Sequence, residues 1–139
     1  MYLTYDEYIA MGGETLEETA FDNLEFEARA TIDWWTFNRL QNEVEYPEAV
    51  KRCMFALINL IKNKQDSMVT DAQAADGTKQ AGITHQSNDG VSISYNVMSA
   101  SRLFDNAKSE IKTTIQQCLN GVVNSLGHKL LYRGVYPDE

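Results

Sequence analysis

The longest apolar periodicity in this chain lies between residues 103 and 126, and it constrains the fold more than any other feature. Large apolar residues recur there at the 3.6-residue spacing of a helix for about six turns. They are Leu103, Phe104, Ala107, Ile111, Ile115, Cys118, Leu119, Val122 and Leu126. So long a stripe has to be buried against other helices. We expect this helix to begin at Ser99 or Ser101, to run to about Ser125 and to end at Gly127.

Two helices are expected in the first forty residues. The segment Thr4-Tyr-Asp-Glu7 is a capping box that starts a short helix, and Gly12-Gly13 stops it. A second helix is expected to start near Thr15 or Leu16. Its buried stripe consists of Phe21, Leu24, Ala28, Ile32 and Trp35.

A third helix follows Pro47, a residue that suits the first position of a helix. The helix is expected to run to about Gln65. Its apolar residues include Val50, Met54, Leu57, Ile58 and Ile61. Because this stripe is wide, the helix is expected at the centre of the bundle.

The segment between the third and fourth helices has a different composition. Residues 67–82 are rich in Ser, Thr, Asp, Ala and Gly, which predicts a long loop. Residues 83–95 read as a β-hairpin, since Asp89-Gly90 suits a tight turn and the apolar residues after it alternate with serines. A lone hairpin is marginally stable, so it should lean on the bundle or pair with another chain. The expected contact residues are Ile83, Val91, Ile93 and Tyr95.

Together these elements predict a mainly α fold in one domain of 139 residues. A bundle of about four helices comprises residues 4–66 and 99–126, with the loop and hairpin of residues 67–96 inserted between helices three and four. An extended C-terminal tail covers residues 127–139. Its apolar residues lack a helical period, so the tail should pack back on the bundle or dock on a partner. The tail residues expected at an interface are Leu130, Leu131, Tyr132, Arg133, Val135 and Tyr136.

The net charge of −8 is unevenly distributed. Residues 1–48 carry twelve acids and two arginines, a net of −10, whereas residues 49–139 carry eight acids and ten bases, a net of +2. Nucleic-acid binding needs a clustered basic face, which this pattern does not offer. Unlike faces suit head-to-tail packing of identical copies, although on charge alone a solvated acidic helix is the favoured interpretation. The candidate acidic face, toward a channel or a subunit, comprises Glu18, Asp22 and Glu25.

No catalytic, metal-binding or cofactor-binding pattern emerges. The two histidines, His85 and His128, have no ligand-like spacing with each other or with a cysteine, and His128 is expected to cap the end of the fourth helix. Cys53 and Cys118 are expected to be free thiols in helices. Trp34 and its aromatic neighbours lack a basic groove, so packing is favoured over base stacking. We expect no cofactor and no metal.

Neither a signal peptide nor a membrane span is expected. Met1 leads directly into an acidic segment, and the most apolar run, Met54 to Ile61, is far shorter than the ~20 residues that cross a bilayer. These features are typical of a soluble protein made in a cytoplasm.

Short motifs spread over the whole chain resemble the head–tail connector, or head-completion adaptor, proteins of tailed bacteriophages and prophages. In chain order they are Tyr5-x-x-Tyr8 before Gly12-Gly13, Phe21 and Leu24, Ala28-x-x-x-Ile32-Asp33, Thr36, Arg39-Leu40, Gly90-Val-Ser-Ile-Ser-Tyr95 and Leu130-Leu-Tyr-Arg-Gly-Val135. Each is weakly specific alone, and their order and spacing strengthen the resemblance. One departure is His85-Gln86, where the family pattern leads us to expect an acidic residue.

The resemblance implies a structural virion protein rather than an enzyme. Such proteins form a ring, typically of twelve copies, that lies beneath the portal of the head and extends the DNA channel toward the tail. The implied partners are further copies of this chain, the portal protein, and the next connector, stopper or tail-completion protein. DNA would pass without specific binding, and the ring would assemble in the bacterial host cytoplasm and remain at the head–tail interface of the virion.

Two other classes of function remain open at this stage. One is another ring-forming part of a phage structure, such as a tail-completion protein. The other is a small intracellular acidic protein that binds or regulates a basic partner. An acid-dependent hydrolase that uses Asp22 and Glu25 is disfavoured, because no accompanying Lys, His or glycine-rich loop is evident.

Overall fold

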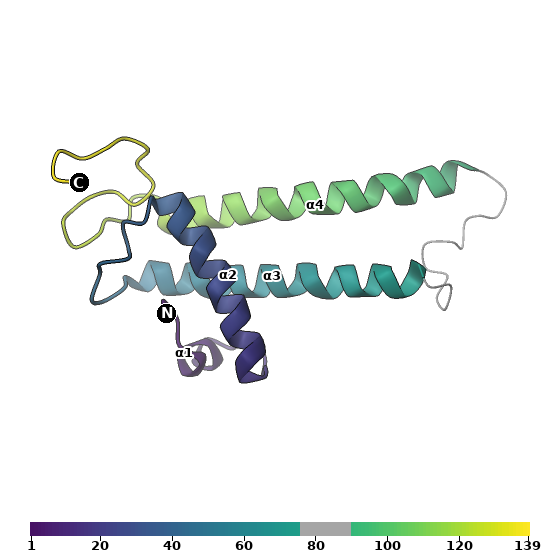
Figure 1. The fold of residues 1–139 in the computed structure, drawn as a ribbon, viewed down its shortest axis with the longest axis horizontal. Coiled ribbons are helices and arrows are strands. Elements are labelled where there is room, and N and C mark those ends of the chain that lie inside the picture. Colours follow the sequence, from purple (N-terminus) through teal and green to yellow (C-terminus); the bar gives the residue numbers. More distant parts are fainter. Residues whose placement is uncertain (76–89) are drawn as a thin grey trace.

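A computed structural model describes the backbone of residues 1–75 and 90–139 and the side chains of residues 1–69 and 105–139. The described residues are mainly helical. Their four helices are α1 (Tyr5–Ala10), α2 (Glu18–Thr36), α3 (Glu48–Ala75) and α4 (Gly90–Leu119). The long helices α3 and α4 lie side by side and antiparallel, and α2 crosses them near the end where α3 begins (Figure 1).

The N-terminal helix α1 starts as the sequence predicts. The Thr4 hydroxyl accepts the Glu7 N–H at 3.3 Å, and the Glu7 carboxylate accepts the Thr4 N–H at 2.9 Å, which completes the capping box. The stop at Gly12-Gly13 also has a packing reason, because a Cβ on Gly13 would lie 2.3 Å from the Tyr8 ring. The Tyr8 ring therefore packs directly on the backbone of this turn.

Helix α2 begins at Glu18, slightly later than expected, and ends at Thr36. The next two residues, Phe37 and Asn38, both adopt positive φ, at 54° and 60°. Two consecutive left-handed residues without glycine are uncommon and cost free energy. They reverse the chain so that Arg39 and Leu40, which follow, are both buried.

The core lies where α1, α2, α3 and the C-terminal half of α4 meet. The predicted stripe of α2 is buried at Phe21, Leu24, Ala28 and Ile32, and Trp35 is partly buried. Every predicted stripe residue of α3 is buried, namely Val50, Met54, Leu57, Ile58 and Ile61. These predictions are confirmed because helical periodicity is a local property of the sequence.

The predicted hairpin is wrong where the structure describes it. Residues 90–95 form the first turns of α4, and α3 continues through residues 67–75, which were expected to be loop. A five-residue alternation does not distinguish a strand from a helix, and Val91 and Tyr95 are also spaced as helical neighbours. Alanines favour helix in residues 71–75. Ile83 and the predicted turn lie outside the described residues.

Helix α4 ends at Leu119, earlier than the sequence pattern predicts. Gly121 adopts φ +80°, the left-handed conformation that commonly follows a helix end. Val122 is only partly buried and Leu126 is 68 % exposed. The helical spacing of apolar residues in the sequence therefore continues past the actual end of the helix. The chain then folds back, with the Leu130 N–H donating to the Val122 carbonyl at 2.9 Å.

Candidate functional site

Residues 120–139 form an irregular segment that loops back on itself beside the end of the bundle, here called the C-terminal cap (Figure 1). The cap lacks a helix or strand, and side chains from the segment after α2 tie it to the bundle. Glu43 accepts the Ser125 N–H and hydroxyl, and Arg39 makes the largest set of contacts. The Arg39 guanidinium donates to the carbonyls of Lys129 and Leu130 at 3.2 Å, of Tyr132, and of Gly134 at 2.7 Å. Its Nε also pairs with the Glu139 carboxylate at 2.5 Å. Residues 122–124 and 128–130 share two backbone hydrogen bonds, and the buried guanidinium supplies further donors to the carbonyls of residues 129–134.

The charged pair at this position shifts both pKa values. The hydrogen bond to Glu139 raises the pKa of Arg39. The same bond, together with the N–H of Tyr136, lowers the pKa of Glu139 to about 2. Both groups therefore carry their charges throughout the physiological pH range.

His128 stabilises the cap from inside and does not cap α4, so that prediction is wrong. Its ring is 6 % exposed and stacks on the Tyr136 ring, with 4.1 Å between centroids and 8° between planes. Its Nε2 lies 2.7 Å from the Asp138 carboxylate. The reason is that α4 ends nine residues before His128.

The cap divides the predicted tail interface into buried and exposed residues. Leu130 is buried, and Leu131 and Tyr136 are half-buried, so these three pack on their own chain. Tyr132 is 49 % exposed and Val135 is 80 % exposed, and Arg133 is also exposed. The tail is therefore folded rather than extended.

A second exposed apolar surface, the α2 patch, comprises Phe26, Ala30 and Trp34. Residues four apart share one face of a helix. Phe26 is 63 % exposed and Trp34 is 72 % exposed, and Ala30 between them is also exposed. Large apolar side chains that line up on a surface helix are typical of an interaction site.

The structure separates the three carboxylates of the predicted acidic face. Glu18 and Asp22 are exposed and lie about two turns and one turn before Phe26, respectively. Glu25 is 2 % exposed, so its expected place on a solvent-facing or subunit-facing surface is wrong. It accepts the Tyr2 N–H at 2.8 Å and lies 3.6 Å from Arg29. The N-terminal segment covers Glu25. Helical spacing within α2 does not predict this contact.

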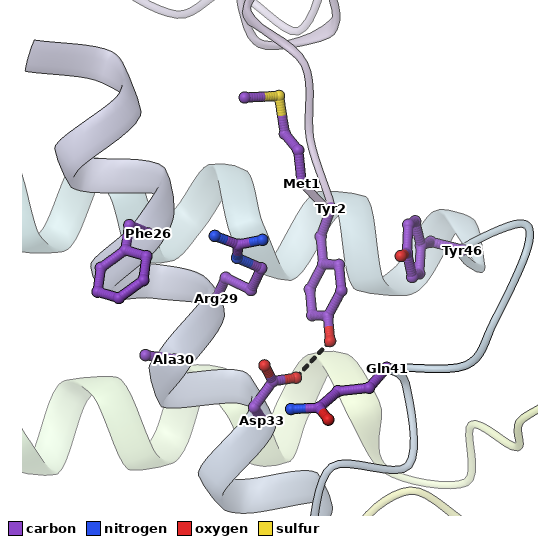
Figure 2. Close-up of a pocket in the computed structure, with 8 residues that line it drawn as sticks. All are labelled: Met1, Tyr2, Phe26, Arg29, Ala30, Asp33, Gln41 and Tyr46. Carbon is purple, nitrogen blue, oxygen red and sulfur yellow. Dashed lines mark hydrogen bonds between the residues drawn. The ribbon is translucent and has the colours of Figure 1, made fainter. Parts of the chain in front are cut away.

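A pocket of about 430 Å³ lies beside the α2 patch (Figure 2). Its lining residues are Met1, Tyr2, Phe26, Arg29, Ala30, Asp33, Gln41 and Tyr46. The Tyr2 hydroxyl donates to Asp33, and burial together with this carboxylate raises the pKa of Tyr2. Arg29 pairs with Glu25, and the Gln41 amide donates to Asn38 at 3.0 Å. Most polar groups of the pocket are thus engaged within the chain, and the Asp33 carboxylate helps to anchor the N-terminal segment through Tyr2.

The described residues contain no group of three or more His, Cys, Asp or Glu side chains that could hold a metal ion. Cys53 and Cys118 are free, and burial raises the pKa of the Cys53 thiol, with Cys118 as its neighbour. Across the described helices, we find none with the length and apolar character needed to span a membrane. His85 lies outside the described residues.

Comparison with known proteins finds no family model, no curated protein and no solved structure that matches this chain. Its function therefore has to be inferred from its own residues. The candidate surfaces are the C-terminal cap and the α2 patch.

The residue that sequence reasoning undervalued is Arg39. In the sequence it appears only as one of the residues that carry the connector resemblance. Its carbonyl partners lie 90 to 95 residues further along the chain, so no local pattern reveals them. The one available signal is a basic residue beside Leu40 in a segment with few other bases.

Proposed function

We propose that this chain is a subunit of a bacteriophage head–tail connector, a ring that joins the portal of the head to the tail and extends the DNA channel. The observation that carries the proposal is the contact made by Arg39. Arg39 belongs to one of the motifs that resemble connector proteins, and its carbonyl partners Leu130, Tyr132 and Gly134 belong to another. Two motifs far apart in the sequence thus form one structural unit.

A ring made of one kind of chain needs two different surfaces on each copy, because head-to-tail contacts are heterologous. The chain exposes two such surfaces, the α2 patch and the C-terminal cap. The helical fold supplies a firm base for both, since α2 packs on α3 and Arg39 ties the cap to the end of α2. The chain acts as a building block and not as an enzyme.

The charge distribution suits a channel component. The exposed carboxylates Glu18 and Asp22 lie on α2, within residues 1–48, which carry a net charge of −10. Negative charge near a channel repels the DNA backbone and lets the duplex pass without sticking. The partners are further copies of the chain, the portal protein, and the next connector or tail-completion protein, and the ring belongs to the virion.

Electron microscopy of the purified chain with the portal ring of the same phage tests the proposal. We expect a second ring, typically of twelve copies, stacked on one end of the portal. A portal ring from an unrelated phage serves as the control and should remain bare. Bare cognate portals at high concentrations of the chain, or equal binding to both portals, would contradict the connector function.

A further inference from the structure

The α2 patch combines apolar side chains with unpaired negative charge. Phe26 and Trp34 project from the face that α2 turns away from α3. Within the described part of the chain, the exposed carboxylates of Glu18 and Asp22 have no side-chain partner. Arg29, the one cation of α2, is already paired with Glu25. This surface therefore offers an apolar contact with an acidic border.

The C-terminal cap has the opposite charge. Its exposed apolar residues are Val123 at 43 %, Leu126 at 68 %, Tyr132 at 49 % and Val135 at 80 %. Of its two acids, Glu139 pairs with Arg39. Asp138 is 60 % exposed and lies 2.7 Å from the His128 ring, which offsets its charge only when protonated, so one carboxylate stands against the two basic side chains of the cap. The basic side chains of Lys129 and Arg133 are exposed, and neither has a side-chain partner among residues 1–69 and 105–139. The free charge of the cap is therefore positive.

We infer that the C-terminal cap of one copy docks on the α2 patch of the next copy of this chain. The inference deepens the proposed connector function, since it names the two surfaces that would close the ring. A contact between two α2 patches would bring carboxylates together, and a contact between two caps would bring cations together. Only the pairing of cap with α2 patch joins apolar surfaces and places opposite charges opposite each other.

The geometry of one chain leaves both surfaces available. The large exposed fractions of Trp34 and Val135 mean that a chain does not cover its own patch with its own cap. The α2 patch lies on helix α2, whereas the cap follows the end of α4 (Figure 1). A contact between unlike surfaces leaves one free surface at each end, so it propagates from copy to copy until a ring closes.

The cap is also rigid enough to act as a docking element. Arg39 binds four of its carbonyls, His128 stacks on Tyr136, and the Tyr132 ring packs against Gly134, where a Cβ would lie 2.4 Å from the ring. A preorganised surface loses little conformational entropy on binding. The cap therefore presents its exposed side chains in a fixed arrangement.

Two complementary variants test this pairing. Trp34→Glu disables the α2 patch and leaves the cap intact, whereas Val135→Glu disables the cap and leaves the patch intact. In each variant alone, every contact contains one damaged surface, so we expect self-association at least about tenfold weaker than in the wild type. An equimolar mixture contains one intact pairing, the α2 patch of the Val135→Glu chain with the cap of the Trp34→Glu chain. Native mass spectrometry should detect this heterodimer and none of the corresponding homodimers.

The matched control is Val44→Glu, because Val44 is 96 % exposed and belongs to neither surface. It should associate like the wild type. Circular dichroism checks that each variant is folded, and Phe26→Glu and Leu126→Glu replace any variant that is not. A wild-type chain that stays monomeric up to about 1 mM, a Val135→Glu chain that associates normally, or a mixture without heterodimers would overturn the inference.

This experiment uses the chain without its portal and is therefore independent of the connector function. If the mixture forms no heterodimer while the wild type still forms rings on the portal, the pairing is wrong and the connector function stands. If heterodimers form but no ring binds the portal, the pairing stands and the connector function is wrong.

Discussion

The N-terminal and C-terminal segments are both fastened to α2 or to the turn directly after it, but by groups of opposite charge. At the N-terminal side, Glu25 accepts the Tyr2 N–H and Asp33 accepts the Tyr2 hydroxyl. At the C-terminal side, Arg39 donates to four backbone carbonyls and pairs with Glu139. One residue, Tyr2, is held in the first case, whereas a segment of several residues is held in the second.

This difference shows that the charge of an anchoring side chain depends on whether the backbone groups it binds are donors or acceptors. A single extended N–H needs one acceptor, which a carboxylate supplies. The cap lacks regular secondary structure, so several of its carbonyls need donors at one point. Only arginine carries enough donors in a fixed planar arrangement to serve them together. We therefore expect the cap to depend more heavily on its anchor than the N-terminal segment does.

The largest predicted effect is that of Arg39→Leu. The change leaves buried carbonyls without donors and Glu139 without its partner, so unfolding free energy should fall by about 3 to 5 kcal/mol. Urea unfolding followed by the fluorescence of Trp34 and Trp35 measures it. Arg39→Lys should recover only part of the loss, because an ammonium cannot reproduce the planar fork.

The control for this prediction is Arg133→Leu, at an exposed arginine of the same cap. Its effect should stay within about 0.5 kcal/mol. Equal losses of unfolding free energy in the Arg39→Leu and Arg133→Leu variants would show that the hydrogen bonds of Arg39 do not specifically stabilise the cap.

The N-terminal anchor should show a smaller effect. Glu25→Ala removes the acceptor of the Tyr2 N–H and leaves Arg29 unpaired, which should cost about 1 to 3 kcal/mol in the same unfolding measurement. The exposed neighbour Glu27 provides the control, since Glu27→Ala should change stability by about 0.5 kcal/mol or less. A loss at Glu25 as large as that at Arg39 would remove the distinction between the two anchors.

Thr4→Ala should have a still smaller and more local effect. It removes the cap of α1 and should cost about 1 kcal/mol. Hydrogen exchange of the α1 amides should accelerate while the amides of the C-terminal cap stay protected. Thr19→Ala, at an exposed helical position, is the control and should leave α1 unchanged. Faster exchange in both ends of the chain would show that the two anchors are coupled.

The smallest effect concerns pH. Because the pKa of Glu139 is lowered to about 2, the folded state binds protons less readily than the unfolded state. The contribution of this carboxylate is complete above its unfolded pKa, near 4.3, and is lost as pH falls toward 2. Glu139→Gln should therefore reduce the loss of stability between about pH 5 and pH 2, measured by urea unfolding at each pH. An unchanged pH profile would show that Glu139 does not stabilise the cap.

The sequence predicts the features that depend on neighbours within a few residues. The capping box at Thr4 and the buried stripes of α2 and α3 are correct because each follows from local spacing. The start of α4 is missed because Val91 to Tyr95 fits both a short strand and a helix. Local patterns also place Leu126 in a helix that Gly121 has already ended.

The candidate site depends more on distant contacts and is less predictable. Of the proposed interface residues in the tail, Tyr132, Arg133 and Val135 are exposed, whereas Leu130 is buried by the fold of the cap. Glu25 shares a helical face with Asp22, but its burial depends on Tyr2, which lies 23 residues away. For Trp34 the sequence favoured core or interface packing over base stacking, and the structure leaves this side chain 72 % exposed, which excludes a place in the core of its own chain.

The hydrogen bonds between Arg39 and the cap also have a consequence for the synthesis of the chain on the ribosome. The partners of Arg39 follow it by 90 to 100 residues, so at 5 to 20 residues per second they leave the ribosome roughly 5 to 20 s after Arg39 does. During that interval the guanidinium remains hydrated and the cap does not exist, although α2 and its apolar patch are already made. If the cap of one copy binds the α2 patch of the next, as we infer, a nascent chain gains its second binding surface only after translation of residues 129–139.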